Sequence, residues 1–148
     1  MRKNKTYRKI SWQEVEMSVD LLAEKIKKEF DLKNIQGIVG IERGGIVPAI
    51  MLSHLLDIEY FAYTDMSHPY NDNRKYIIVD DIADTGRTLG TFVWESDIMS
   101  SLYFREHTCC KKVKDNLIFA KKINNDDWLI FPWELRQSDI TVIQVPEN

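Results

Sequence analysis

Two carboxylates and a group of small polar residues follow one apolar stretch of this sequence, and together they could bind a phosphorylated sugar. Residues 76–79 read Tyr-Ile-Ile-Val, and Asp80 and Asp81 come directly after them. An apolar run of this kind is typical of a buried strand in a parallel sheet. Residues 84–88 (Asp-Thr-Gly-Arg-Thr) then form a polar turn that leads into a helical pattern. A strand, a polar turn and a helix form a geometry that points backbone N–H groups at a phosphate.

The carboxylates and the turn suit different parts of such a ligand. Asp80 and Asp81 would repel a phosphate, so they are better placed for ribose hydroxyls or a bound Mg²⁺, which takes oxygen ligands. Thr85, Gly86 and Thr88 suit the phosphate, because small residues let the backbone approach and hydroxyls add donors. The alternative is an acidic turn without a ligand, which any α/β protein can carry after a strand.

A second turn of similar kind lies earlier in the chain. Residues 42–45 (Glu-Arg-Gly-Gly) follow the apolar residues 36–41, and a helical pattern begins at residue 46 with Pro48 in its first turn. Paired glycines allow backbone angles closed to other residues and the close approach of an anion. An ordinary Gly-Gly turn with a solvated arginine is the alternative.

The last third of the chain adds a lysine and an aromatic segment. Lys121 ends the apolar residues 117–120, and residues 128–134 read Trp-Leu-Ile-Phe-Pro-Trp-Glu. A lysine at the carboxyl end of a strand faces the ligand crevice of an open α/β fold. A solvated lysine, and tryptophans that only fill the core, are the alternatives.

Composition narrows the class of protein. The 148 residues are 44% hydrophobic and 29% charged, as in a soluble globular domain. The net charge of -3 argues against nucleic-acid binding through bulk charge, and no apolar run is long enough for a membrane span. The two cysteines are adjacent and have no metal-ligand spacing, so we expect a reducing, cytoplasmic setting.

The order of the predicted elements indicates an α/β fold. A capping box at Ser11 predicts the start of a helix. We expect helices over residues 12–30, 46–56 and 89–103, the last broken near 96–97, strands over 36–41, 58–63, 76–79 and 117–120, and a loop over 109–116. This order predicts a single domain, residues 1–148, with a parallel twisted sheet and helices on both faces.

Residues 79–88 resemble, position by position, the phosphoribosyl pyrophosphate (PRPP) signature of type I phosphoribosyltransferases. Residues 42–48 are similar to the pyrophosphate loop of that family, which often contains a non-proline cis peptide, here expected between Glu42 and Arg43. The resemblance implies a pyrophosphate loop of Glu42, Arg43, Gly44 and Gly45, and PRPP contacts from Asp80, Asp81, Ala83, Asp84, Thr85, Gly86, Arg87 and Thr88. It also implies that Asp80 and Asp81 hold Mg²⁺.

Residues 128–134 resemble the hood of the xanthine–guanine-type members, which implies a small C-terminal hood over residues 123–148. In the family the first tryptophan of this segment stacks on the base, so Trp128, Leu129 and Ile130 are expected there. Lys121 matches the lysine that reaches the 6-oxo group of the base. The implied protein is a homodimeric, Mg²⁺-dependent purine-salvage enzyme that converts PRPP and a 6-oxopurine to nucleoside 5′-monophosphate and pyrophosphate, with Asp84 as general acid and base.

One part of the chain departs from the family pattern. The family has a long lid between the third strand and the PRPP signature, whereas residues 64–74 are few, with Tyr70 and Arg74 as the candidates for lid residues. A non-catalytic PRPP- or nucleotide-binding regulatory protein of the same fold is therefore an alternative. A phosphoacceptor receiver domain is a weaker one, because its acidic pair should lie on the first strand.

Overall fold

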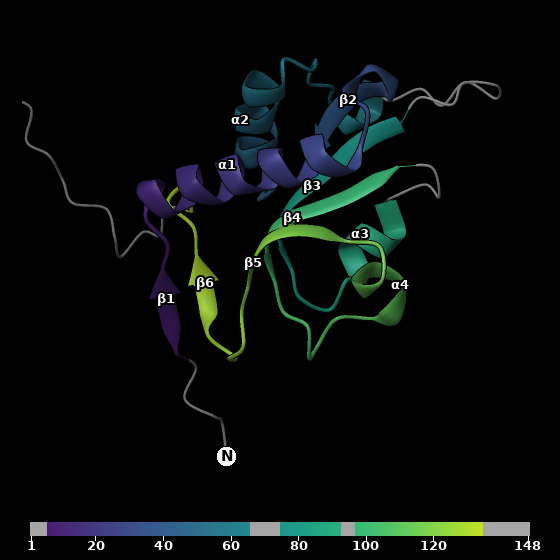
Figure 1. Cartoon of the computed structure of the whole chain (residues 1–148). Helices are drawn as coiled ribbons and strands as arrows, with labels where there is room; N and C mark the ends of the chain where they lie inside the picture. Colours follow the sequence, from purple (N-terminus) through teal and green to yellow (C-terminus); the bar gives the residue numbers. More distant parts are fainter. Residues whose placement is uncertain (1–5, 66–74, 93–96, 135–148) are drawn as a thin grey trace, which may run out of the picture.

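A computed structural model of the chain describes residues 6–65, 75–92 and 97–134 and contains a four-stranded parallel sheet (Figure 1). The strand order is β2 (Ile35–Gly40), β3 (Lys75–Ala83), β4 (Ile98–Phe104) and β5 (Ile118–Lys122). Every neighbouring pair in this sheet is parallel. The predicted parallel α/β fold is confirmed.

Helices cover both faces of the sheet (Figure 1). Ile77 and Val79 of β3 belong to one core cluster with residues of α1 (Trp12–Glu29) and α2 (Ile46–Leu56). Ile78, next to them in the strand, belongs to a second cluster with residues of α3 (Arg87–Phe92) and α4 (Lys111–Lys114). Because successive strand side chains point to opposite faces, this alternation gives the sheet two buried faces and holds β3 in the centre.

The predicted start of the first helix is confirmed at its N-cap. The Ser11 hydroxyl accepts a hydrogen bond from the Glu14 N–H at 3.1 Å, and the Glu14 carboxylate accepts one from the Ser11 N–H at 2.9 Å. This capping box satisfies two of the donors that a helix leaves open at its N-terminus.

The structure corrects the prediction of a helix over residues 89–103. The helix there ends at Phe92, and residues 98–104 form β4, which lies between β3 and β5 with every residue buried. A short apolar run that is buried all round carries no periodicity that separates a strand from a helix. The sequence pattern therefore predicted a helix for the residues that form the third strand of the sheet.

Two further segments differ from the prediction. Residues 58–63 contribute an isolated parallel bridge between Tyr60 and Ile38 and no strand, and η2 (Tyr63–Asp65) follows. The short helix α4 lies within the predicted loop, residues 109–116.

A small two-stranded parallel sheet lies beside the main one, and the sequence did not predict it (Figure 1). It pairs β1 (Tyr7–Lys9) with β6 (Trp128–Ile130). The remaining element is η1 (Leu32–Asn34). None of the helices in the described ranges is long and apolar enough to cross a lipid bilayer.

Candidate active site

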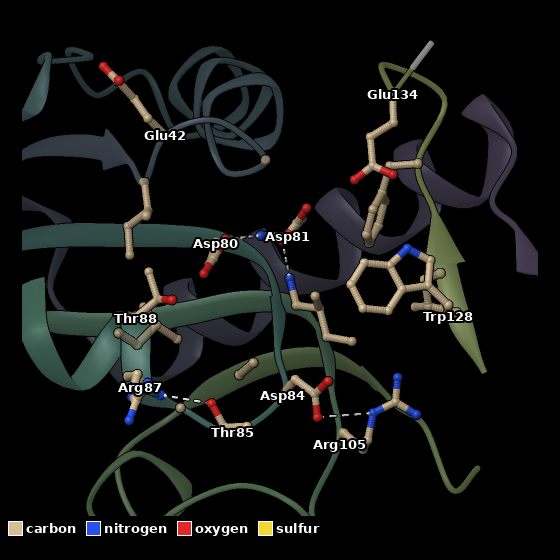
Figure 2. A pocket seen from close by; sticks show the side chains of 18 residues that line it. Glu42, Asp80, Asp81, Asp84, Thr85, Arg87, Thr88, Arg105, Trp128 and Glu134 are labelled. Carbon is tan, nitrogen blue, oxygen red and sulfur yellow. Dashed lines mark hydrogen bonds and ion pairs between the residues drawn. The ribbon is translucent and has the colours of Figure 1, made fainter. Parts of the chain in front are cut away.

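A cavity of about 350 Å³ lies where β3 and β4 end, between the turn after β2 and strand β6 (Figure 2). Most of the residues predicted for the site line it: Glu42, Gly44, Asp80, Asp81, Ala83, Asp84, Thr85, Gly86, Arg87, Thr88, Trp128 and Leu129. Arg43, Gly45, Lys121 and Ile130 are not among its lining residues. Tyr70 and Arg74, the lid candidates, lie outside the described residues.

The turn after β3 is shaped by one glycine. Gly86 has a φ of 79°, a left-handed conformation that side chains other than glycine adopt at a cost. Next to it the Thr85 hydroxyl accepts a hydrogen bond from the Arg87 N–H at 3.3 Å, at the start of α3. Residues 84–88 therefore form a compact polar turn along one wall of the cavity (Figure 2); we call it the phosphate loop.

The turn after β2 packs directly on β3. A Cβ added to Gly44 would lie 2.0 Å from the Asp81 Oδ2, and one added to Gly45 would lie 2.1 Å from the Val79 carbonyl oxygen. Only glycine allows both close approaches. The peptide bond between Glu42 and Arg43 is cis, as predicted. This turn therefore sets its backbone against the carboxylate pair of β3.

The carboxylate pair is partly buried and electrostatically unfavourable as it stands. Burial, followed by the charge of the Asp81 carboxylate, raises the pKa of Asp80 to about 8. Burial also raises the pKa of Asp81. Backbone N–H groups satisfy one oxygen of each: Asp81 N–H donates to Asp80 Oδ1 at 2.9 Å, and Ile82 N–H donates to Asp81 Oδ1 at 2.7 Å. A cation beside the pair would offset the repulsion between the two charges.

The raised pKa of Asp80 predicts a pH dependence of stability. An aspartate in the unfolded chain loses its proton near pH 4, whereas folded Asp80 keeps its proton up to about pH 8. In that window the folded state binds more protons, so the free energy of unfolding falls as pH rises. We expect a steeper fall for the wild type than for Asp80→Asn when denaturant unfolding is followed from about pH 5 to 8 without divalent cations. Equal slopes in the two proteins would contradict the shift.

Asp84 lies in the same cavity and is held from two sides. Its Oδ1 accepts a hydrogen bond from the Thr108 hydroxyl at 2.6 Å. The same oxygen lies 3.2 Å from the Arg105 Nε, in an ion pair without hydrogen-bond geometry. Both contacts use Oδ1, so within the described residues Oδ2 is the oxygen left for a ligand. The side chain of Asp84 is 44% exposed, which leaves it accessible from the cavity.

Arg105 is the residue of this site that sequence reasoning missed. It directly follows β4, is only 5% exposed and lines the cavity. Its guanidinium donates to the backbone carbonyls of Asn125 and Asp127, the latter at 2.8 Å. Figure 2 shows it beside Asp84 and below Trp128. A strand assignment for residues 98–104 would have placed Arg105 at a carboxyl end of the sheet, where such folds bind ligands.

Lys121, which the sequence analysis placed at the base, lies on β5. Its neighbour in the sheet is Tyr103 of β4, so it is one strand further from the phosphate loop than Arg105. Lys121 is partly buried, and the cavity is not lined by it.

The sequence and the fold of the chain were compared with those of known proteins. No protein-family model matches the chain. It is 27% identical over 145 residues to a xanthine-guanine phosphoribosyltransferase of Desulfotalea psychrophila, with 84% of each protein covered. A purine phosphoribosyltransferase of Pyrococcus horikoshii shares its fold with a TM-score of 0.63 and 25% identity, over 95% of this chain and 99% of that one. A xanthine-guanine-hypoxanthine phosphoribosyltransferase of Helicobacter pylori has a TM-score of 0.70 and 17% identity, over 88% and 93% of the two chains. The chain is therefore similar to purine phosphoribosyltransferases in sequence and in fold along most of its length.

The two tryptophans of residues 128–134 have different surroundings. Trp128 is 47% exposed and lines the cavity. Trp133 is partly buried in the main core, where it stacks on Phe131 with ring centroids 5.0 Å apart and also contacts Trp12. Trp128 therefore lies at the cavity, whereas Trp133 packs in the core.

This contrast predicts different effects of two alanine substitutions. Stacking of a base on an aromatic side chain contributes about 1–3 kcal/mol. Trp128→Ala should therefore weaken nucleotide binding about ten-fold or more and leave the unfolding midpoint nearly unchanged. Trp133→Ala should mainly lower the midpoint. Calorimetric titration and thermal unfolding of both variants test this, and equal losses of affinity at unchanged stability would contradict it.

Proposed function

We propose that the protein is a 6-oxopurine phosphoribosyltransferase, which transfers the 5-phosphoribosyl group of PRPP to the base and releases pyrophosphate. The observation that carries this proposal is one cavity that joins the phosphate loop, the glycine turn after β2, the carboxylate pair and Trp128. These parts correspond to the groups of the two substrates: the phosphate loop to the 5′-phosphate, the glycine turn to the pyrophosphate, the carboxylate pair to the ribose and Trp128 to the base. The similarity to purine phosphoribosyltransferases along most of the chain supports the same reading.

PRPP would lie along β3 with its two charged ends apart. The phosphate loop would bind the 5′-phosphate through backbone N–H groups and the hydroxyls of Thr85 and Thr88. The turn formed by residues 42–45, of which Glu42 and Gly44 line the cavity, would bind the pyrophosphate through its backbone N–H groups. Asp80 and Asp81 would then face the ribose hydroxyls between the two loops. Holding both ends fixes the reacting carbon against the base, which is mainly an effect of positioning.

The residues present suit a magnesium ion. Asp80 and Asp81 offer carboxylate oxygens, and their raised pKa values show that negative charge there lacks compensation. Within the described residues no cluster of three or more histidine, cysteine or carboxylate side chains could hold a metal by itself. Mg²⁺ commonly uses one or two carboxylates together with substrate phosphates. When bound, it would neutralise charge on the departing pyrophosphate.

Asp84 would act as the general base and acid for the purine. Asp84 lines the cavity, and its hydrogen bond from Thr108 and its ion pair with Arg105 both use Oδ1, which leaves Oδ2 for a ligand within the described residues. A carboxylate held in this way can take a proton from a purine nitrogen as the glycosidic bond forms and return it in the reverse direction. Thr108 and Arg105 act as positioning residues for this group.

Arg105 would distinguish a 6-oxo group from a 6-amino group. Each terminal guanidinium nitrogen gives one N–H to a backbone carbonyl and keeps a second. A guanidinium has donors and no acceptor, so it pairs with the oxygen of hypoxanthine, guanine or xanthine and opposes the amino group of adenine. We therefore place Arg105 in the role that the sequence analysis gave to Lys121.

Competition between bases tests this function. Hypoxanthine, guanine, xanthine and adenine are supplied together with PRPP and Mg²⁺, and the nucleotides formed are separated and counted. We expect 6-oxopurine nucleotides to dominate, because a buried donor opposed by another donor is strongly rejected. If adenine reacts best, the proposed base class is wrong.

A further inference from the structure

The only two cysteines of the chain lie against the phosphate loop. A Cβ added to Gly86 would lie 2.9 Å from the Cys110 sulfur and 3.0 Å from the Cys109 sulfur. Both thiols are free and meet at the same point of the loop. They lie outside the cavity wall itself, since neither is among its lining residues.

The segment that carries these thiols also holds the loop by hydrogen bonds. The Cys110 N–H donates to the Thr85 carbonyl oxygen at 2.8 Å. The Thr108 hydroxyl donates to the Asp84 carbonyl oxygen at 3.0 Å and to the Asp84 carboxylate. Residues 108–110 therefore support the loop from behind, and a displacement of this segment would reach Asp84, Thr85 and Gly86 together.

The two thiols differ in access. Cys110 is exposed and Cys109 is partly buried. Burial raises the pKa of Cys109, with the Cys110 thiol beside it as the next cause. Cys110 is therefore the thiol that a reagent meets first, and Cys109 is the second thiol within reach. A disulfide between the two is unfavourable, because adjacent Cα atoms are about 3.8 Å apart and disulfides usually need at least 4.4 Å.

We propose that Cys109 and Cys110 form a modification site for trivalent arsenic compounds, and that its occupation deforms the phosphate loop. With an organic arsenoxide, each thiol loses its proton, two As–S bonds form, and the oxygen leaves as one molecule of water. Arsenic stays trivalent, so the step needs no oxidant or reductant. Both sulfurs already lie in close contact with Gly86, so a chelate that bridges them adds a bulky group beside the loop. We expect it to displace residues 108–110 or the loop.

The consequence for substrate rests on the proposed function. If the loop binds the 5′-phosphate of PRPP, the chelate should weaken PRPP binding, because loop N–H groups lose their alignment with a charged phosphate. The loss of such a hydrogen bond corresponds to an affinity about ten-fold lower or more.

Phenylarsine oxide is the probe. The full chain is treated with it, washed with a monothiol, and examined by intact mass, by hydrogen exchange of residues 84–88 and by calorimetric titration with PRPP. We expect one arsenical per chain, faster exchange in the loop, PRPP affinity lower by about ten-fold, and full reversal by 2,3-dimercaptopropanol. Cys109→Ser and Cys110→Ser each keep one thiol, so both should lose the arsenical in the wash and bind PRPP as the untreated protein does.

Three results would overturn the inference: no retained arsenical on the wild type, unchanged exchange and affinity in the labelled protein, or equal retention by the serine variants. The proposed function fails in a different way, namely when the untreated protein does not bind PRPP. In that case intact mass and loop exchange still decide the inference about the thiols.

Discussion

Replacing Asp84 by asparagine should lower the rate of nucleotide formation about 10²- to 10⁴-fold, the usual contribution of general acid–base catalysis. The amide keeps the shape of the side chain and can still accept the hydrogen bond from Thr108, but it cannot take up a proton at the base. PRPP affinity should change little, because the neutral amide does not repel phosphate. Single-turnover rates and calorimetric titration separate the two quantities.

A matched control for Asp84 is Thr108→Val, which removes the hydrogen bond and keeps the carboxylate. It should reduce the rate far less than Asp84→Asn does, since the proton carrier remains. If Asp84→Asn is as active as the wild type, the assignment of Asp84 as proton carrier is wrong.

Replacing Arg105 by glutamine should lower kcat/KM for 6-oxopurines about 10- to 100-fold, as expected for the loss of a hydrogen bond from a charged group. The rate with adenine should fall less, so the preference for oxo bases narrows. Arg105→Lys keeps a cation with donors only and should retain that preference. Steady-state kinetics with hypoxanthine and adenine measure both effects.

Lys121→Gln is the matched control, because Lys121 lies on the neighbouring strand and does not line the cavity. It should leave the preference unchanged. The opposite result, in which Lys121→Gln loses the preference for 6-oxopurines and Arg105→Gln keeps it, would show that Lys121 recognises the base. Thermal unfolding of each variant distinguishes this from loss of structure, since Arg105 also binds the carbonyls of Asn125 and Asp127.

The parts of the site that follow one another in the chain could be predicted from the sequence. Residues 79–88 carry a strand end, a carboxylate pair and a turn in one stretch, so their proximity needs no knowledge of the fold. The turn at residues 42–45 could be added because carboxyl ends of parallel strands lie at one edge of a sheet. Trp128 could be assigned to the site only from the resemblance to the family.

The parts that depend on tertiary structure could not be predicted. Residues 98–104, which include Ser100 and Ser101, are buried on all sides, so the segment lacks the alternation that marks a half-exposed strand. Arg105 was missed with them. The pairing of β1 with β6 joins residues 7–9 to residues 128–130, and three-residue strands leave almost no pattern in a sequence. Thr108 lies in the loop after β4 and contacts Asp84, and no local sequence pattern predicts this contact.

The proposed function is tested most directly by measuring whether the protein converts PRPP and a purine base to products over repeated turnovers. The purified chain is incubated with PRPP, Mg²⁺ and labelled hypoxanthine, guanine or xanthine, and nucleotide and pyrophosphate are measured over time. We expect nucleotide and pyrophosphate to form in equal amounts, over many turnovers, with at least one of these bases. Tight binding of PRPP or nucleotide without product, from protein shown to be folded, would contradict it and identify a binding protein of the same fold.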